Sequence, residues 1–290
     1  SKINRYRFID VEKTNYPITI LCKCMRVSRP GFYCWKNRPE KPDTTALKKV
    51  MVKSIHEESK GTYGYPRIKQ VMKRRGINIS RMTIYKFMKE LGISGIPKRR
   101  RNRSKSSRVQ DGKNLLQRDF ETTKPNKVWC VDISYISTKQ GWLYLAVVID
   151  LFSRRIVGYD FAPHQRTSLP LKALKKAIES RKPKKGLIHH SDRGSQYCSE
   201  EYLRTLEEQE FRSSLSVAGT CLDNAVVESF FSSLKQECVY RDRFTTRTEA
   251  MEKISQYIDT FYNSKRIHSS NNGVSPMEFE HLYRCKKIHF

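Results

Sequence analysis

Three acidic residues in separate local settings are the strongest candidates for chemistry in this sequence. Asp132 lies in the run VWCVDISYI, Asp192 follows LIHHS, and Glu228 belongs to LDNAVVESFFSSLK, with 35 residues between the last two acids. Two Mg²⁺ ions about 4 Å apart can stabilise the entering and leaving oxygens of a phosphodiester displacement, and Mg²⁺ prefers oxygen ligands. The triplet therefore predicts metal-dependent phosphoryl transfer on a nucleic acid.

Each acid also has a simpler structural explanation. Asp132 could point to water from a strand edge, Asp192 could serve a turn, and Glu228 could be a solvated surface residue. Two further acids are set aside from the triplet. Asp150 ends an apolar run before LFSRR, which favours a turn or a salt bridge with an arginine, and Asp223 is better explained as a helix cap.

Hydrophobic patterning indicates the elements that position these acids. Strands are expected over 127–138, 142–150 and 155–162, with a polar turn at Lys139–Gly141 suited to a hairpin. A helix over 168–181 follows, with Leu169, Leu171, Leu174, Ala177 and Ile178 on its inner face. The pattern continues as strand 186–190, helix 199–209, strand 211–217 and a helix that starts near Leu222–Asn224. This order predicts an α/β fold with a mixed sheet flanked by helices.

The last of these helices places polar residues beside the third acid. Asn224, Glu228 and Lys235 share one face at helical spacing, whereas Phe230, Phe231 and Leu234 supply the apolar side. Asn224 and Lys235 are therefore expected to lie on the same face as Glu228, and Asn224 is a predicted DNA contact.

The charge of the chain calls for a polyanionic partner. Lys and Arg number 57 against 29 Asp and Glu, a net charge of +28, and residues 1–125 hold 32 of the basic and 10 of the acidic residues. Such a basic region binds phosphates with strong salt dependence, although charge alone does not distinguish DNA from RNA or a membrane surface.

The basic N-terminal part has the pattern of two helix-turn-helix units. In the first, a short helix opens at Pro17–Cys22 and a second runs from Arg29 to Lys36 after the N-cap Ser28. In the second, a helix beginning at Tyr65 precedes one that follows the N-cap Ser80. We predict DNA contacts from residues on the second helix of each unit: Arg29, Lys36, Arg81, Thr83 and Lys86. Three-helix units without a DNA role are the alternative.

The segments outside the catalytic region carry less information. Residues 97–108 are a basic linker whose Arg99, Arg100 and Arg101 are expected to meet phosphate. Thr245–Tyr262 is expected to be a helix with a packing stripe of Met251, Ile254, Ile258 and Phe261. Zinc binding by Cys22, Cys24, Cys34 and His56 is not favoured, because the spacing lacks a CxxC pair and Cys22 occupies an apolar position. Reduced thiols are expected, since no secretory signal or membrane-spanning stretch is evident.

Several motifs together resemble one family. The stretches VDISYI, GWLYLAVVIDLFSRRIVGY, HSDRGSQY, DNAVVESFFSSLK and FYNSKRIHSS are similar to the DDE transposases of bacterial insertion sequences of family three, specifically the product of the second reading frame. Retroviral integrases resemble the chain more distantly. The likeness runs from about Tyr16 to Phe279, which is nearly the whole chain.

The resemblance implies a ribonuclease-H-like catalytic core in which Asp132, Asp192 and Glu228 bind two Mg²⁺ ions, with Mn²⁺ as a substitute. Lys235 matches the basic residue that contacts the element's end. The implied partners are double-stranded DNA, both terminal inverted repeats and target, and further copies of the chain, at least a dimer, with no membrane. The implied location is the bacterial cytoplasm, at the nucleoid.

These observations lead to a five-part organisation. We expect helix-turn-helix modules over 1–45 and 46–96, a linker over 97–124, the core over 125–244 and a helical extension over 245–290. The start at Ser1 instead of Met fits processing, a residual tag or a frameshift-fused product without its first part. The expected function is DNA cleavage and strand transfer. A non-catalytic DNA-binding regulator would bind DNA without needing metal, and a nuclease on the same fold would cleave without joining.

Overall fold

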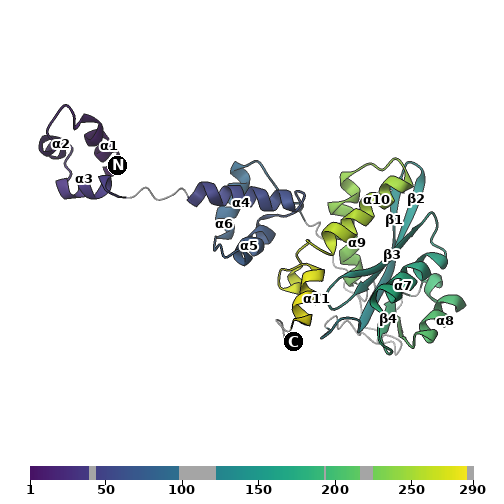
Figure 1. Cartoon of the computed structure of the whole chain (residues 1–290). Helices are drawn as coiled ribbons and strands as arrows, with labels where there is room; N and C mark the ends of the chain where they lie inside the picture. Colours follow the sequence, from purple (N-terminus) through teal and green to yellow (C-terminus); the bar gives the residue numbers. More distant parts are fainter. Residues whose placement is uncertain (39–43, 98–121, 193, 216–224, 286–290) are drawn as a thin grey trace, which may run out of the picture. The chain divides into compact units, whose positions relative to one another are not determined.

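The computed structural model describes residues 1–38, 44–97, 122–192, 194–215 and 225–285. The chain divides into two compact units, Ser1–Met51 and Val52–Phe290. Figure 1 labels most of their helices and strands. None of the helices in the described ranges is both long and apolar enough to cross a bilayer. The predicted linker with Arg99, Arg100 and Arg101 lies outside the described residues.

The first unit is a small helical module. It contains α1 (Lys2–Glu12), α2 (Ile18–Cys24) and α3 (Arg29–Lys36). Its core consists of Ile9, Leu21, Cys22 and Phe32. The Ser28 hydroxyl caps α3 by accepting a hydrogen bond from the Gly31 amide at 3.3 Å, as its position predicted. Cys22 is 2 % exposed in this core, which agrees with its apolar position in the sequence.

A second helical module begins the larger unit. It combines the end of α4 (Thr44–Glu58) with α5 (Tyr65–Arg74) and α6 (Arg81–Glu90), and the two predicted helices are confirmed. The Ser80 hydroxyl caps α6 by accepting from the Thr83 amide at 3.0 Å. Gly76, with φ of +78°, ends α5 in a left-handed conformation that suits glycine. The buried residues of these three helices are Val52, Ile55, Ile68, Met72, Ile84, Phe87 and Met88.

A five-stranded sheet forms the centre of the larger unit. Its strands are β1 (Val128–Thr138), β2 (Gly141–Asp150), β3 (Ile156–Ala162), β4 (Ile188–Ser191) and β5 (Arg212–Leu215), in the spatial order β3-β2-β1-β4-β5. The first three pair antiparallel, whereas β4 pairs parallel with both β1 and β5. Gly141, at φ of +99°, makes the tight turn of the first hairpin. The predicted mixed sheet is confirmed. Its strand order is that of the ribonuclease-H-like fold.

Helices cover the sheet and divide its residues between two faces. α7 (Ser168–Arg181) packs on β1, β2 and β3, and α8 (Glu200–Glu208) contacts β5. Trp129 and Val131 of β1 belong to the apolar cluster that includes Leu174 of α7 and Tyr202 of α8. Because side chains alternate along a strand, Asp132 points away from this cluster. The predicted inner face of α7 is confirmed, with Ile178 partly buried at its margin.

Further helices lie beside β1 and β2 (Figure 1). α9 (Ala225–Glu237) contacts β1, and α10 (Arg247–Gln256) contacts β2. A π-helical turn, Tyr257–Tyr262, continues α10. The predicted stripe is confirmed at Ile254, Ile258 and Phe261, which are buried, but it is wrong at Met251, which is 37 % exposed beside the buried Ala250. Short 3₁₀ turns occur at Ser195–Tyr197, Val239–Arg241 and Ser269–Asn271.

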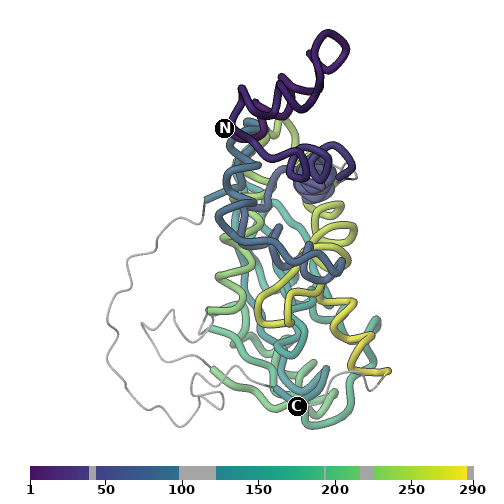
Figure 2. The backbone as a smooth tube through the Cα atoms, turned by 90° about the vertical axis from the view of Figure 1, so that its left-hand side faces the viewer, coloured from purple at the N-terminus to yellow at the C-terminus, as the bar shows by residue number. Residues whose placement is uncertain are grey.

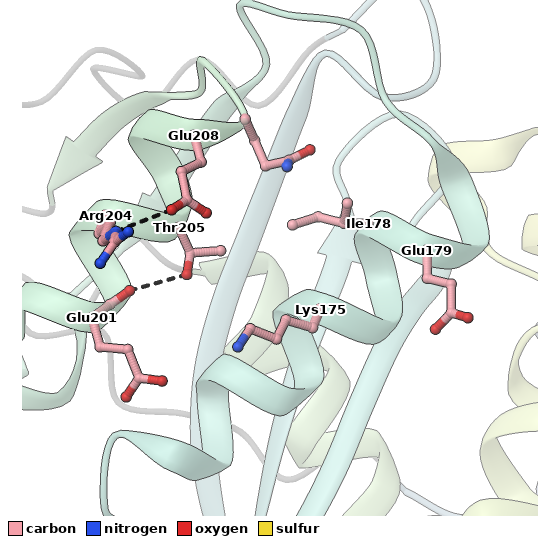
Figure 3. Close-up of a pocket in the computed structure, with 8 residues that line it drawn as sticks. Lys175, Ile178, Glu179, Glu201, Arg204, Thr205 and Glu208 are labelled. Atoms are coloured by element: carbon pink, nitrogen blue, oxygen red, sulfur yellow. Dashed lines mark hydrogen bonds and ion pairs between the residues drawn. The ribbon is translucent and has the colours of Figure 1, made fainter.

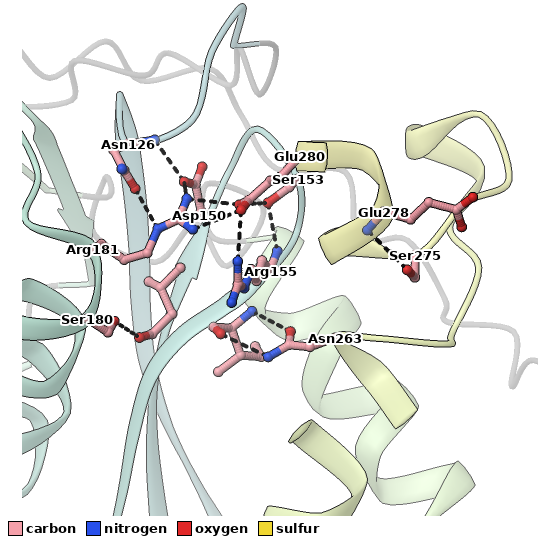
Figure 4. A network of polar contacts seen from close by, with 12 residues as sticks. Asn126, Asp150, Ser153, Arg155, Ser180, Arg181, Asn263, Ser275, Glu278 and Glu280 are labelled. Carbon is pink, nitrogen blue, oxygen red and sulfur yellow. Dashed lines mark hydrogen bonds and ion pairs between the residues drawn. The ribbon is translucent and has the colours of Figure 1, made fainter. Parts of the chain in front are cut away.

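The C-terminal helix α11 (Pro276–Arg284) is tied to the sheet by a buried polar network (Figure 4). Glu280, 2 % exposed, accepts from both terminal nitrogens of Arg181 at 2.8 and 2.9 Å and from Arg155 at 2.9 Å. The Ser153 hydroxyl also donates to it at 2.8 Å. Burial would raise the pKa of Glu280, but Arg181 and Arg155 outweigh burial and hold that pKa below its ordinary value. Figure 2 shows the C-terminal segment in yellow returning beside the strands.

Asp150 belongs to the same network, and its contacts explain why an acid ends this apolar strand. It is completely buried, accepts from the Asn126 and Phe152 amides at 2.8 and 3.0 Å, and pairs with Arg181 at 3.3 Å. The amide of Arg154 donates to its carbonyl at 2.9 Å. The predicted turn is therefore present, whereas the ion pair is made with Arg181 of α7, an arginine outside the LFSRR run that suggested it. Burial is the main cause that raises the pKa of Asp150 to about 6.

A second ionic network joins the helical module to the end of α9. The guanidinium of Arg266 donates to the two carboxylate oxygens of Glu237 at 2.8 and 2.7 Å, and Arg67 of α5 donates to the same carboxylate at 3.3 Å. The Ile267 amide donates to the Tyr63 hydroxyl at 2.8 Å. Arg266 and Ile267 of the motif FYNSKRIHSS thus contribute to packing between these elements.

Candidate active site

Asp132 is held on the face of β1 that the apolar cluster leaves free. The Ile133 amide donates to its carboxylate at 2.7 Å. Burial is the first cause that raises the pKa of Asp132 to about 7, and the charges of Asp192 and Glu228 raise it further, against the opposing effects of the Ile133 amide and Lys235. The two other acids therefore act electrostatically on Asp132.

The parallel pairing of β4 with β1 brings Asp192 to the same place. Cys130 pairs with His190, so Asp132 and Asp192 each follow the last paired position by two residues. The Gly194 amide donates to the Asp192 carboxylate at 2.9 Å, which fixes the turn after the strand. The Asp192 carboxylate can therefore stabilise this turn and still take part in an active site.

Glu228 approaches from α9. It lies in the first turn of that helix and is partly buried. Phe230, Phe231 and Leu234 are 1 %, 6 % and 1 % exposed, so the predicted apolar side of the helix is confirmed. The predicted cap Asp223 and the predicted DNA contact Asn224 both lie outside the described residues.

The three acids share one electrostatic environment, but the structure does not close them into a coordination cage. Across the described ranges, no group of three or more His, Cys, Asp or Glu side chains is arranged to hold a metal ion. Three like charges in a partly buried site repel one another, and the raised pKa of Asp132 reports that repulsion together with burial. As a donor set, three carboxylates with room for water suit Mg²⁺.

Tyr197 is a residue that the sequence did not reveal as part of this site. It is 3 % exposed, and its buried hydroxyl has no hydrogen-bond partner among the residues that the structure describes. Burial raises the pKa of Tyr197 well above its ordinary value, and the charges of Asp132 and Asp192 add to the effect. The motif DRGSQY drew attention to its aspartate, whereas the tyrosine five positions later has the residue type of a core position.

Lys235 of α9 is partly buried and lies near Tyr135 of β1. Its ammonium nitrogen is 4.8 Å from the centre of the Tyr135 ring. Burial lowers the pKa of Lys235, and the charge of Asp132 opposes that change. The structure thus brings Lys235 close to the predicted acids.

The predicted DNA contacts of the helical modules are distributed over exposed helix faces. Arg29 and Lys36 on α3 and Arg81 and Lys86 on α6 are exposed, while Thr83 is partly buried. Lys36 lies 3.8 Å from Asp10, and the Thr83 hydroxyl is 2.8 Å from that of Ser80. Within the described residues, Arg29, Arg81 and Lys86 have no comparable contact.

A separate hollow between α7 and α8 contains no member of the triplet (Figure 3). Its lining includes Lys175, Glu179, Glu201 and the pair formed by Arg204 and Glu208, whose Nε and Oε1 atoms are 3.0 Å apart. Opposite charges compensate one another there. We assign this hollow no chemistry.

The chain matches known protein families over most of its length. Models described as integrase core domains match residues 122–221 and 228–282, and a model of an HTH-like domain matches residues 42–101. The fold and the matched models define the class: an integrase-type catalytic core preceded by a helix-turn-helix-like domain.

Full-length relatives identify the family. Transposase InsF for insertion sequence IS3A of Escherichia coli K12 is 36 % identical over 282 residues, which cover 95 % of this chain and 98 % of the relative. An uncharacterized 31 kDa protein of insertion element IS600 from Shigella sonnei is 37 % identical over 267 residues, 91 % and 98 % of the two chains. The chain belongs to the IS3 family of insertion-sequence transposases.

Solved structures show a more distant likeness. The HTLV-2 integrase catalytic core domain in complex with magnesium, in its trimeric form, is 16 % identical with a TM-score of 0.44, covering 55 % of this chain and 98 % of that one.

The raised pKa of Asp132 predicts a measurable dependence of stability on pH. Folding raises this pKa, so the folded chain binds the proton more tightly and loses stability as pH rises from about 4 through 7. Asp132→Asn removes the charge and keeps an oxygen for the Ile133 amide. In EDTA, urea unfolding should show the variant gaining over the wild type between pH 5 and pH 8, on the order of 2 kcal/mol. An advantage that stays constant across this range would contradict the prediction.

Proposed function

We propose that this transposase cuts DNA at the terminal inverted repeats of its element and joins the new 3′ ends to target DNA. Water attacks the phosphate at the element's end and displaces the 3′ oxygen, which leaves as a 3′-OH. That 3′-OH then attacks a target phosphate and displaces the target's own 3′ oxygen. The observation that carries this proposal is the convergence of three acids: the charges of Asp192, just after β4, and of Glu228, in the first turn of α9, both act on Asp132 within β1.

Asp132, Asp192 and Glu228 are the residues that would hold Mg²⁺ or Mn²⁺, with two ions per site. When bound, the ions would supply charge stabilisation for the entering and leaving oxygens. The amides of Ile133 and Gly194 orient two of the carboxylates at 2.7 and 2.9 Å. Lys235 contributes a positive charge beside them for the phosphate of the bound DNA strand.

The helical modules are proposed to supply sequence-specific binding. Exposed Arg81 and Lys86 on α6, and Arg29 and Lys36 on α3, extend from second helices of the kind that enter a major groove. We propose the same five-part division of the chain as the sequence predicted, with Asn224 and the arginines at 99–101 as further contacts. Two DNA ends must be handled together, so at least two copies act at once, on nucleoid DNA in the bacterial cytoplasm.

The direct test incubates the full chain with labelled DNA from its own element's end and a target plasmid. Mg²⁺, Mn²⁺ or EDTA is added, and wild type is compared with Asp192→Asn. Metal-dependent nicking and joined products that vanish in the variant are expected. Cleavage without joining would identify a nuclease instead. Binding that is indifferent to metal and to the substitution, with no cleavage, would identify a regulator.

A further inference from the structure

Two exposed aromatic rings lie next to the proposed active site and have no packing role in the core. Tyr135 of β1 is 57 % exposed and Trp142 of β2 is 50 % exposed. Their ring centres are 5.1 Å apart at an interplanar angle of 86°. Large apolar surface of this kind is normally buried, so an exposed pair in contact marks a binding surface.

The hairpin that carries this pair is held by hydrogen bonds to Phe244, just before α10, and to Arg247, the first residue of α10. The Lys139 amide donates to the Phe244 carbonyl at 3.1 Å, and the Arg247 amide donates to Gln140 at 3.0 Å. The Arg247 side chain donates to the Trp142 carbonyl at 3.0 Å. The rings are therefore presented on a fixed support, which lowers the entropic cost of binding.

Positive charge surrounds the pair and connects it to the acids. Lys235 lies over Tyr135 and acts electrostatically on Asp132, while Arg247 and Lys139 flank the hairpin tip. Tyr135 is three residues beyond Asp132, or about 10 Å along the strand, and side-chain alternation places its ring on the opposite face of β1. That distance is comparable to one or two nucleotides measured from a phosphate held at the acids. Lys235, which lies over this ring and acts on the charge of Asp132, therefore links the pair to the acids.

We propose that Tyr135 and Trp142 form a stacking platform for one unpaired base of the DNA end held in the active site. Aromatic faces beside lysine and arginine are the chemistry by which proteins bind single-stranded nucleic acid. A paired base inside a duplex offers no free face, so the platform selects an end with an overhang or a frayed base. The cationic surroundings favour this ligand over a second protein copy. The inference rests on the proposed function, because it places DNA at Asp132.

The test measures how tightly the full chain binds two DNA ends of identical sequence, one blunt and one with an unpaired overhang that contains 2-aminopurine. Ca²⁺ replaces Mg²⁺, and affinity is read by fluorescence anisotropy and stacking by 2-aminopurine quenching. Trp142→Ala should weaken overhang binding about 10-fold and abolish the quenching. Blunt-end binding should change less than about two-fold, because phosphate contacts remain. Trp142→Phe keeps a ring and should retain most of both signals.

Three results would overturn the platform. One is unchanged overhang binding in Trp142→Ala, and another is equal weakening of both DNA ends. The third is a loss of self-association in sedimentation, which would identify a surface between copies of the chain. Thermal melts of both variants establish that they fold.

The platform and the proposed function can fail separately. Loss of overhang preference while wild-type strand joining persists would remove the platform and keep the transposase. Overhang-selective binding that depends on Trp142, in a chain that never joins DNA, would remove strand transfer and keep the platform.

Discussion

Replacing Glu228 by glutamine is expected to reduce strand joining by at least about 10³-fold, or roughly 4 kcal/mol of transition-state stabilisation. Glutamine keeps the length and an acceptor oxygen but lacks the negative charge that would hold a divalent cation. The substitution lies in the first turn of α9, whose buried side consists of other residues, so folding should be preserved. Affinity for DNA should stay the same or increase slightly, because one charge that repels phosphate is removed.

A matched control for Glu228→Gln comes from α8. Glu201 has the same side chain and lines the hollow between α7 and α8, apart from the triplet (Figure 3). Glu201→Gln should leave joining within about two-fold of wild type. The measurement is the initial rate of joining of a pre-cleaved end at saturating Mg²⁺. Joining by Glu228→Gln at a rate near that of Glu201→Gln would exclude Glu228 from the chemistry.

Strongly patterned elements were predictable from the sequence to within two residues. The hairpin β1–β2 and the helix α7 have regular apolar positions and a glycine at the turn, so their bounds follow from local rules. The same holds for α3 and α6, whose caps Ser28 and Ser80 hold the predicted bonds.

Weakly patterned helices escaped prediction for a physical reason. α1 buries only Ile9, and α4 buries Val52 and Ile55, so neither has an apolar stripe dense enough to stand out. The π-helical turn at Tyr257–Tyr262 likewise has no local signature in the sequence.

The site was predictable in its acids but not in its surroundings. Residue type and spacing alone indicated Asp132, Asp192 and Glu228. Parallel register between β1 and β4 explains how the two aspartates meet, and that register depends on long-range pairing. The buried Tyr197 hydroxyl has no partner within the described residues, and the Trp142 ring is exposed; neither property follows from residue type, so both could be found only in three dimensions.

The buried acids that stabilise the fold were also not predictable from local sequence. Asp150 and Glu280 have the residue type of a surface position, yet they are 0 % and 2 % exposed. Arg181 of α7 pairs with both, and Arg155, just before β3, pairs with Glu280. A partner as far away in the chain as Arg155 is from Glu280 cannot be recognised from local pattern.

Glu280→Gln is expected to destabilise the larger unit by about 3–5 kcal/mol, because it leaves the buried guanidinium of Arg181 without its main counter-charge. The carboxylate accepts from Arg181, Arg155 and Ser153, and an amide cannot satisfy all of these donors. The melting temperature should fall by roughly 6 to 20 °C. Thermal and urea unfolding of the full chain, followed by circular dichroism, would measure the loss.

Glu278 provides the matched control on the same helix. It pairs with Arg74, but both side chains are about two-fifths exposed, so solvent screens the pair. Glu278→Gln should therefore cost no more than about 1 kcal/mol. The difference between the two variants isolates burial, since the helix, the residue type and the change are the same. Equal losses would show that Glu280 is a replaceable surface charge and that α11 is held by its apolar contacts with Phe152 alone.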